Sequence, residues 1–398
     1  MSDEADCTTP KTALILGGGG ARAAYQIGVL DAIRQILNAA PGHAQSFPFQ
    51  VLCGTSAGAI NAAWLASHTH SYDEAVRQLV SVWGDIRPND VFRTDVPGAL
   101  ANAGHWLTAL SMGWLIREAP RSLFDNRPLR ELLTQRINFR AIDTSIAKGE
   151  LDALAISTSS YSSGHHVTFY QSRSHIRPWT RNQRLAERTT INLEHLMASS
   201  AIPVVFPATQ LHIDQHLEFF GDGAIRQSSP ISPAIHLGAT RIVVIGAGRV
   251  EENSNEELSG NSSHQINYPS LGQIGGHVMA SIFLDGVASD VERIERINRT
   301  LKLMTEQQRI ESGLKPLDLL AINPSQRLDS LAEPFIRNLP RTTRSALRIL
   351  GATGRRGVGL ASYLLFDREY TQTLIELGQR DGLNRSEEIA NFFTHDSQ

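Results

Sequence analysis

One pentapeptide limits the possible folds of this chain more than any other feature. Gly54 and Gly58 flank Ser56 in the sequence Gly-Thr-Ser-Ala-Gly. An apolar run at 49–53 precedes it, and small residues with helical spacing follow over 57–67. A serine at a sharp turn from a strand into a helix is typical of a nucleophile elbow, because the strained turn needs residues without bulk beside the serine. The N-terminus of the following helix favours negative charge that develops at the hydroxyl.

A second glycine-rich turn lies near the start of the chain. An apolar run at 12–16 and a helical pattern over 22–39 flank four consecutive glycines, Gly17, Gly18, Gly19 and Gly20. Their N–H groups can bind an anion, either a phosphate or the oxyanion of acyl transfer. The spacing also fits a dinucleotide fingerprint, but that site needs an acidic residue at the end of the second strand, where this chain has Leu52-Cys53-Gly54. We favour the oxyanion interpretation, because it explains both glycine motifs with one chemistry.

Composition narrows the class of protein. The 398 residues are 41% hydrophobic and 19% charged, with a net charge of −3, which predicts a globular protein without the basic surface that nucleic acid requires. Only Cys7 and Cys53 are present, one in a polar tail and one in a buried strand, so we expect no disulfide and a reducing compartment. The acidic N-terminus lacks the pattern of a signal peptide, and we expect a cytoplasmic protein.

Strand and helix patterns alternate over the first 250 residues. Strands are predicted at 12–16, 49–53, 151–157, 166–170, 217–220 and 241–246. Helices are predicted at 22–39, 57–67, 72–84, 127–135, 193–199 and 231–237. This alternation indicates an α/β fold of three layers, α/β/α, with a mostly parallel central sheet covered on both faces.

Composition changes suggest how the chain is divided. We expect a flexible tail over 1–10 and an α/β domain over 11–250. Residues 251–266 are polar and rich in serine and asparagine, which predicts a mobile loop or linker. We expect residues 267–398 to form a mainly helical C-terminal region, with a long helical pattern over 277–310 and a short strand at 317–322.

An uncharged segment interrupts the α/β pattern at 96–116. Its length is close to that of a membrane span, but proline, glycine and polar residues break it up. The favoured interpretation is a helical insertion packed on the core. The alternative is a cap or interfacial surface that contacts lipid, because Trp106 and Trp114 suit the depth of lipid headgroups. The protein would then be peripheral to a membrane.

The serine needs a partner that takes its proton. His236 and His277 are the formal histidine candidates, but neither lies in a glycine-lined loop after a convincing strand. Asp222 is a better candidate, because it follows the predicted strand at 217–220 and lies between two glycines. In a partly desolvated site its pKa would rise toward neutrality, although an ordinary Asp-Gly turn remains the alternative.

Four stretches together resemble the patatin-like phospholipases of bacterial type, which are lipid acyl hydrolases with a Ser–Asp dyad. Residues 18–22 look like the family's glycine-rich oxyanion loop, and 54–58 look like its elbow. Residues 198–207 are similar to its A-S-x-A-x-P-x-x-F-P block, and 221–224 look like its Asp-Gly motif. All four occur in the family's order over roughly 11–250, while the C-terminal region resembles bacterial extensions only loosely.

The resemblance implies a role for each matching residue. Ser56 would be the nucleophile and Asp222 the general base. Arg22 would support the oxyanion loop or attract an anionic headgroup. The oxyanion hole would be formed by backbone N–H groups around Gly18, Gly19, Gly20 and Ala21. One departure is Ala23, where the family usually has glycine; a helix tolerates alanine, so we expect the loop to be retained.

The leading hypothesis is a carboxylic-ester hydrolase of the phospholipase A or lysophospholipase type that forms an acyl-Ser56 intermediate on a lipid substrate. It implies no cofactor and no metal, and the sequence has no H-E-x-x-H, C-x-x-C or EF-hand pattern. Three alternatives remain open: acyl transfer on the same residues, a catalytically silent lipid-binding membrane regulator, and a dinucleotide-binding oxidoreductase.

Overall fold

The computed structural model describes residues 10–39, 47–93, 122–227, 229–246, 289–349 and 358–394, together with position 287. The predicted tail, apart from residue 10, lies outside the described residues. The predicted insertion at 96–116 and the predicted loop at 251–266 also lie outside them.

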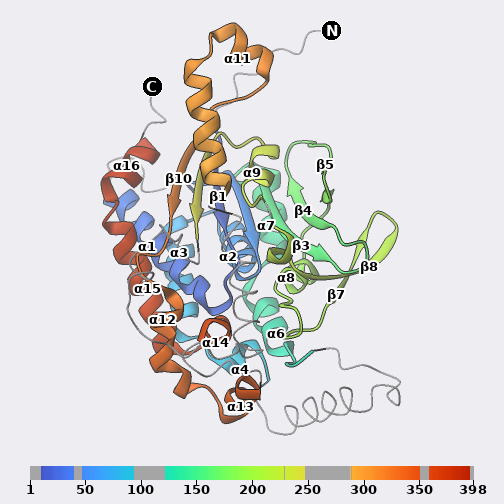
Figure 1. Ribbon diagram of the computed structural model, residues 1–398, viewed down its shortest axis with the longest axis vertical. Helices are drawn as coiled ribbons and strands as arrows, with labels where there is room; N and C mark the ends of the chain where they lie inside the picture. Colours follow the sequence, from blue (N-terminus) through green and yellow to red (C-terminus); the bar gives the residue numbers. More distant parts are fainter. Residues whose placement is uncertain are drawn as a thin grey trace, which may run out of the picture.

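Within the described residues, ten strands form one sheet (Figure 1). The path runs β10-β9-β1-β2-β3-β4-β6-β5, and β8 pairs with both β3 and β7. The strands are β1 (Thr12–Leu16), β2 (Val51–Thr55), β3 (Ala153–Ser160), β4 (His166–Ser172), β5 (Thr180–Arg181), β6 (Arg184–Arg188), β7 (Thr209–Ile213), β8 (His216–Asp222), β9 (Arg241–Ile245) and β10 (Asp318–Ile322).

The centre of the sheet is parallel, from β10 through β9, β1 and β2 to β3. Beyond β3, the pairs β3–β4, β3–β8, β5–β6 and β7–β8 are antiparallel. The chain reverses by short connections at β3–β4, β5–β6 and β7–β8, whereas β8 returns to β3 from a distant part of the sequence. The pair β4–β6 is parallel. The predicted α/β fold with a mostly parallel sheet is confirmed, and its outer part is mixed.

Helices surround this sheet. They include η1 (Gly20–Ala23), α1 (Ala24–Ala39), α2 (Ala57–Ala66), α3 (Tyr72–Asp85), α4 (Pro88–Val91), α6 (Arg127–Arg136), α7 (Phe139–Lys148), α8 (Leu193–Ser199), η2 (Gly223–Arg226) and α9 (Ser232–His236). The C-terminal part contains α11 (Glu306–Ser312), α12 (Leu328–Ala332), η3 (Glu333–Asn338), α13 (Arg341–Ile349), α14 (Val358–Leu364), α15 (Arg368–Leu383) and α16 (Ser386–Thr394). A further helix runs through 289–303. None of the described helices is both long and apolar enough to cross a membrane.

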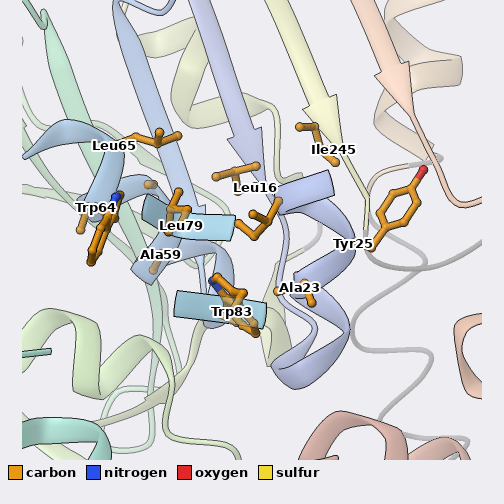
Figure 2. Close-up of a cluster of buried hydrophobic side chains, with 14 of the residues drawn as sticks. Leu16, Ala23, Tyr25, Ala59, Trp64, Leu65, Leu79, Trp83 and Ile245 are labelled. Carbon is orange, nitrogen blue, oxygen red and sulfur yellow. The ribbon is translucent and has the colours of Figure 1, made fainter. Parts of the chain in front are cut away.

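Each face of the sheet has its own hydrophobic core. Along β1, Leu14 and Leu16 belong to one cluster, whereas Ala13 and Ile15 belong to the other. Alternate residues of a strand point to opposite faces, so burial of all five requires cover on both sides. Figure 2 shows part of the larger cluster, in which Leu16 lies among side chains that include Trp64 of α2 and Trp83 of α3. The layers are therefore α/β/α.

The C-terminal residues belong to this same fold. Strand β10 extends the parallel sheet beside β9. Helix α15 packs along α1 (Figure 1), where a Cβ atom on Gly28 would overlap the Ile375 carbonyl and one on Gly378 would overlap the Tyr25 carbonyl. Two glycines thus allow the helix backbones to touch. The Gln379 side chain also donates to Asp31 at 2.9 Å, which fixes the register of the two helices.

Candidate active site

Two strands bring Ser56 and Asp222 to one point on β3. The N-terminal half of β3 pairs with β2, ending at Thr55 opposite Ser157. The C-terminal part pairs with β8, beginning at Asp222 opposite Thr158. Since β4 occupies the other edge of β3, β2 and β8 share one edge and meet end to end. Ser56 directly follows β2 and Asp222 ends β8, so the topology places them together.

Ser56 has the backbone conformation of a nucleophile elbow. Its φ of 55° and ψ of −128° lie in a region that costs a non-glycine residue of order 1–3 kcal/mol. The Ser56 N–H donates to Ser199 Oγ at 2.8 Å, and that hydroxyl donates to the Ser157 carbonyl at 2.6 Å. A Cβ atom on Gly58 would overlap the Leu16 carbonyl, so α2 begins in backbone contact with the end of β1.

Asp222 is a fully buried carboxyl. Its Oδ1 accepts from the Ala224 N–H at 2.9 Å, whereas Oδ2 has no hydrogen-bond partner among the described residues. Burial raises the pKa of Asp222 to about 7, partly offset by the neighbouring Ser56 hydroxyl and the Ala224 N–H. The Ser56 contact lacks the geometry of a regular hydrogen bond, and such contacts commonly tighten only when substrate binds. A carboxyl with this pKa can exchange protons with the hydroxyl near neutral pH.

The predicted oxyanion loop lies beside this pair. Gly18, Gly19, Gly20 and Ala21 are all buried, and Gly20 lines the same cavity as Ser56. In the described part of the chain, the N–H groups of Gly18, Gly19 and Gly20 form no hydrogen bond. Buried donors without partners are costly, and an oxyanion would satisfy them.

Arg22 is held by α14 from the far end of the chain. Its guanidinium donates to Ser362 Oγ at 2.8 Å, to the Gly359 carbonyl at 3.1 Å and to the Tyr363 hydroxyl at 3.3 Å. It also lies 4.1 Å from the centre of the Tyr363 ring. With 4% of its surface exposed, Arg22 is closed to a headgroup, which favours loop support over its alternative role.

An apolar cavity opens at Ser56. It holds about 700 Å³ of non-atom space, part of which is open to solvent. Gly20, Ser56 and Ser200 contribute to its lining, and Arg136 is the charged side chain among its described lining residues. Most of the wall is aliphatic and aromatic, including Ile60, Trp64, Leu79, Trp83, Leu133 and Phe206. A space of this kind suits a hydrocarbon chain, because burial of each methylene contributes about 0.8 kcal/mol.

A comparison with known families places the chain in one of them. The sequence profile named Patatin-like phospholipase matches residues 14–235, which is more than half of the chain. The chain belongs to the patatin-like phospholipase family. This assignment indicates a lipid hydrolase, and the matched region contains both Ser56 and Asp222.

Similar solved structures are distant. VipD from Legionella pneumophila is 13% identical, with a TM-score of 0.33 over 93% of this chain and 67% of that chain. Human GIVD cytosolic phospholipase A2, in complex with methyl gamma-linolenyl fluorophosphonate, is 10% identical, with a TM-score of 0.44 over 98% and 59%. ExoU of Pseudomonas aeruginosa, in complex with SpcU, is 16% identical, with a TM-score of 0.25 over 89% and 70%. These likenesses are too remote to carry a functional argument. A comparison with curated proteins finds no match.

The structure describes one of the two histidine candidates, and it lies apart from Ser56 and Asp222. His236 stacks on Trp179 near the second core cluster, and His277 lies outside the described residues. Cys53 is buried, which raises the pKa of its thiol to about 12 and makes it an apolar filler. Among the described residues no cluster of histidine, cysteine and carboxylate side chains could hold a metal ion.

Three contributors were not singled out from sequence. Ser199 holds the elbow, but only its place in the Ala-Ser block signals it. Ser200 lines the cavity with a buried hydroxyl that has no hydrogen-bond partner among the described residues. Ser362 supports Arg22 across 340 positions, a separation at which no local pattern could link the two.

Proposed function

We propose that this chain hydrolyses carboxylic esters of phospholipids or lysophospholipids, with Ser56 as nucleophile and Asp222 as general base. The observation that carries the proposal is a buried carboxyl with a pKa of about 7 beside a strained serine at an apolar cavity. A hydrolase that used a histidine base would need an imidazole there, and His236 lies elsewhere.

The reaction proceeds in two halves. Ser56 Oγ attacks the acyl carbonyl carbon while the Asp222 carboxylate takes the hydroxyl proton. The N–H groups of the Gly18–Gly20 segment stabilise the resulting oxyanion. The bond to the alcohol breaks, Asp222 gives its proton to the leaving oxygen, and an acyl-Ser56 ester remains. Asp222 then takes a proton from water, the hydroxide adds to the ester, and Ser56 leaves with that proton as the fatty acid is released.

The proposal is tested by following fatty acid release from phosphatidylcholine vesicles and lysophosphatidylcholine micelles by mass spectrometry. Wild type releases fatty acid, Ser56→Ala and Asp222→Asn do not, and His236→Ala retains activity. Added glycerol shows whether the acyl group passes to water or to an alcohol. Loss of activity in His236→Ala with retention in Asp222→Asn would overturn the dyad. Absence of hydrolysis of both lipids by folded wild type would overturn the hydrolase.

A further inference from the structure

A second, smaller pocket lies near the other core cluster. It holds about 270 Å³ of non-atom space, part of it open to solvent. Along β4, His166 and Thr168 line this pocket, whereas the intervening Val167 belongs to the cluster of the Ser56 face. Since alternate strand residues point to opposite faces, this pocket and the Ser56 cavity lie on opposite sides of the sheet.

Two arginines face each other at this pocket. The turn between β5 and β6 consists of Asn182 and Gln183, with φ values of 33° and 62°. Two residues of positive φ make the tight hairpin whose twist matches the strands. The hairpin pairs Arg181 directly with Arg184, and both line the pocket. Side chains of a directly opposed pair share one face, and like charges in that position are destabilising.

No carboxylate of the described residues forms an ion pair with either arginine. Neither Arg181 nor Arg184 forms an ion pair or a side-chain hydrogen bond in this part of the chain, although other arginines of the chain pair closely with carboxylates. Asp290 is close enough to feel the charge of Arg184, but its oxygens accept from Ser229 Oγ and the Ile231 N–H, each at 3.1 Å. Asp290 also pairs with Arg293 at 3.6 Å, so it compensates the repulsion between the two guanidinium groups only in part and at longer range.

The remaining lining is polar. His166 is 4% exposed, and its Nδ1 has no hydrogen-bond partner among the described residues. Ser232 adds a hydroxyl, and Trp179 forms a wall with His236 stacked on it at 4.6 Å. Burial lowers the pKa of His166 to about 4, so the ring is neutral near pH 7 and hydrogen-bonds the Gly223 backbone with one nitrogen. The other nitrogen, Nδ1, can then accept from the hydroxyl of hydrogen phosphate, the dianion of inorganic phosphate.

We propose that Arg181, Arg184 and His166 form a binding site for a phosphate dianion, either inorganic phosphate or a phosphate monoester. Each guanidinium can donate two parallel hydrogen bonds to two phosphate oxygens, and two guanidinium groups balance the two negative charges of the dianion. The pocket is too small for an acyl chain, so the site is separate from the Ser56 cavity. The His166 ring of this site contacts the backbone of Gly223, the residue that directly follows Asp222.

The test measures binding of inorganic phosphate and glycerol 3-phosphate to the full chain by calorimetry and by the shift in Tm. Wild type binds, and Tm rises with ligand concentration. Arg181→Gln and Arg184→Gln weaken binding at least tenfold and the double variant abolishes it. Arg177→Gln is the matched control, because this exposed arginine lies in the same segment but outside the pocket lining, and it binds as wild type does.

A second readout separates the site from damage to the fold. Without phosphate, the glutamine variants at 181 and 184 have a Tm equal to or above that of wild type, because the repulsion is removed. Vesicles with and without phosphatidic acid show whether a lipid phosphate also reaches the site. No binding to wild type at millimolar phosphate, or unchanged binding to the double variant, would overturn the proposal. Equal binding of acetate would overturn its specificity for a dianion.

Discussion

Asp222 reaches Ser56 from a strand that runs along the same edge of β3 as β2 but in the opposite direction. Thr55 pairs with Ser157, and Asp222 pairs with the next residue, Thr158. The separation of the two side chains is therefore set by adjacent positions of one buried strand rather than by a flexible loop. Such placement on rigid elements suits a pair that must hold its geometry through both halves of a reaction.

The pH dependence of activity follows from Asp222. Because burial raises its pKa to about 7, the carboxylate form needed as base disappears as pH falls through that value. With a soluble short-chain ester, kcat/KM is expected to rise with pH up to about 7 and to level off above it. Asp222→Asn lowers kcat about 100- to 10,000-fold. A profile that stays flat between pH 5 and pH 9 would contradict an aspartate base.

The stability of the folded protein is expected to fall with rising pH over the range in which activity rises. A carboxyl whose pKa is higher in the folded than in the unfolded state binds more protons when folded, so stability falls as pH rises toward that pKa. Asp222→Asn removes this ionisation. We expect the variant to gain more Tm relative to wild type at pH 8 than at pH 5, measured by thermal unfolding. The same difference at both pH values would mean that the folded-state pKa is not raised.

We expect the Ser200 hydroxyl to contribute to activity and to lower the stability of the fold. Its buried hydroxyl lacks a partner among the described residues, so Ser200→Ala removes an unsatisfied group and should leave Tm unchanged or higher. If the hydroxyl donates to the substrate at the cavity, kcat/KM falls on the order of tenfold. Ser159→Ala is the matched control, since that buried hydroxyl also lacks a partner there but does not line the cavity. Equal activity in both variants would exclude a substrate contact at Ser200.

The contact between Arg22 and α14 links the C-terminal region to the proposed oxyanion loop. Ser362→Ala removes one hydrogen bond to a buried charge, and such bonds contribute about 1.5–3 kcal/mol. We expect kcat to fall roughly tenfold with little change in KM, because the loop stabilises the transition state rather than the bound substrate. Ser330→Ala, on an exposed face of α12, should match wild type. A change confined to KM would place Arg22 in substrate binding instead.

Local sequence patterns predicted much of the fold. The bounds of β1 and α8 agree with the predicted 12–16 and 193–199. Strand β2 begins two residues later than predicted and continues to Thr55, because Gly54 and Thr55 extend the ladder to β3 although glycine disfavours strands. The predicted strand at 217–220 grows to His216–Asp222, since its ends pair with β7 and β3.

Elements without a strong apolar pattern were not predicted. Strands β6 and β7 and helix α7 carry polar or charged residues at many positions, and pairing or packing in the folded chain decides their state. The turn between β5 and β6 takes positive φ without glycine, so its usual sequence signal is missing. Within the site, sequence motifs predicted Ser56, Asp222 and the glycine-rich loop. The hydrogen bonds between Arg22 and α14 depend on tertiary contact alone, so no motif could predict them.

The central claim is that Ser56 is activated by Asp222. It is tested most directly by intact-mass analysis after exposure to a fluorophosphonate probe, on wild type, Ser56→Ala and Asp222→Asn. The account predicts a single adduct on wild type, none on Ser56→Ala, and much slower labelling of Asp222→Asn at neutral pH. Labelling of Asp222→Asn at the wild-type rate, or an adduct that persists in Ser56→Ala, would contradict it.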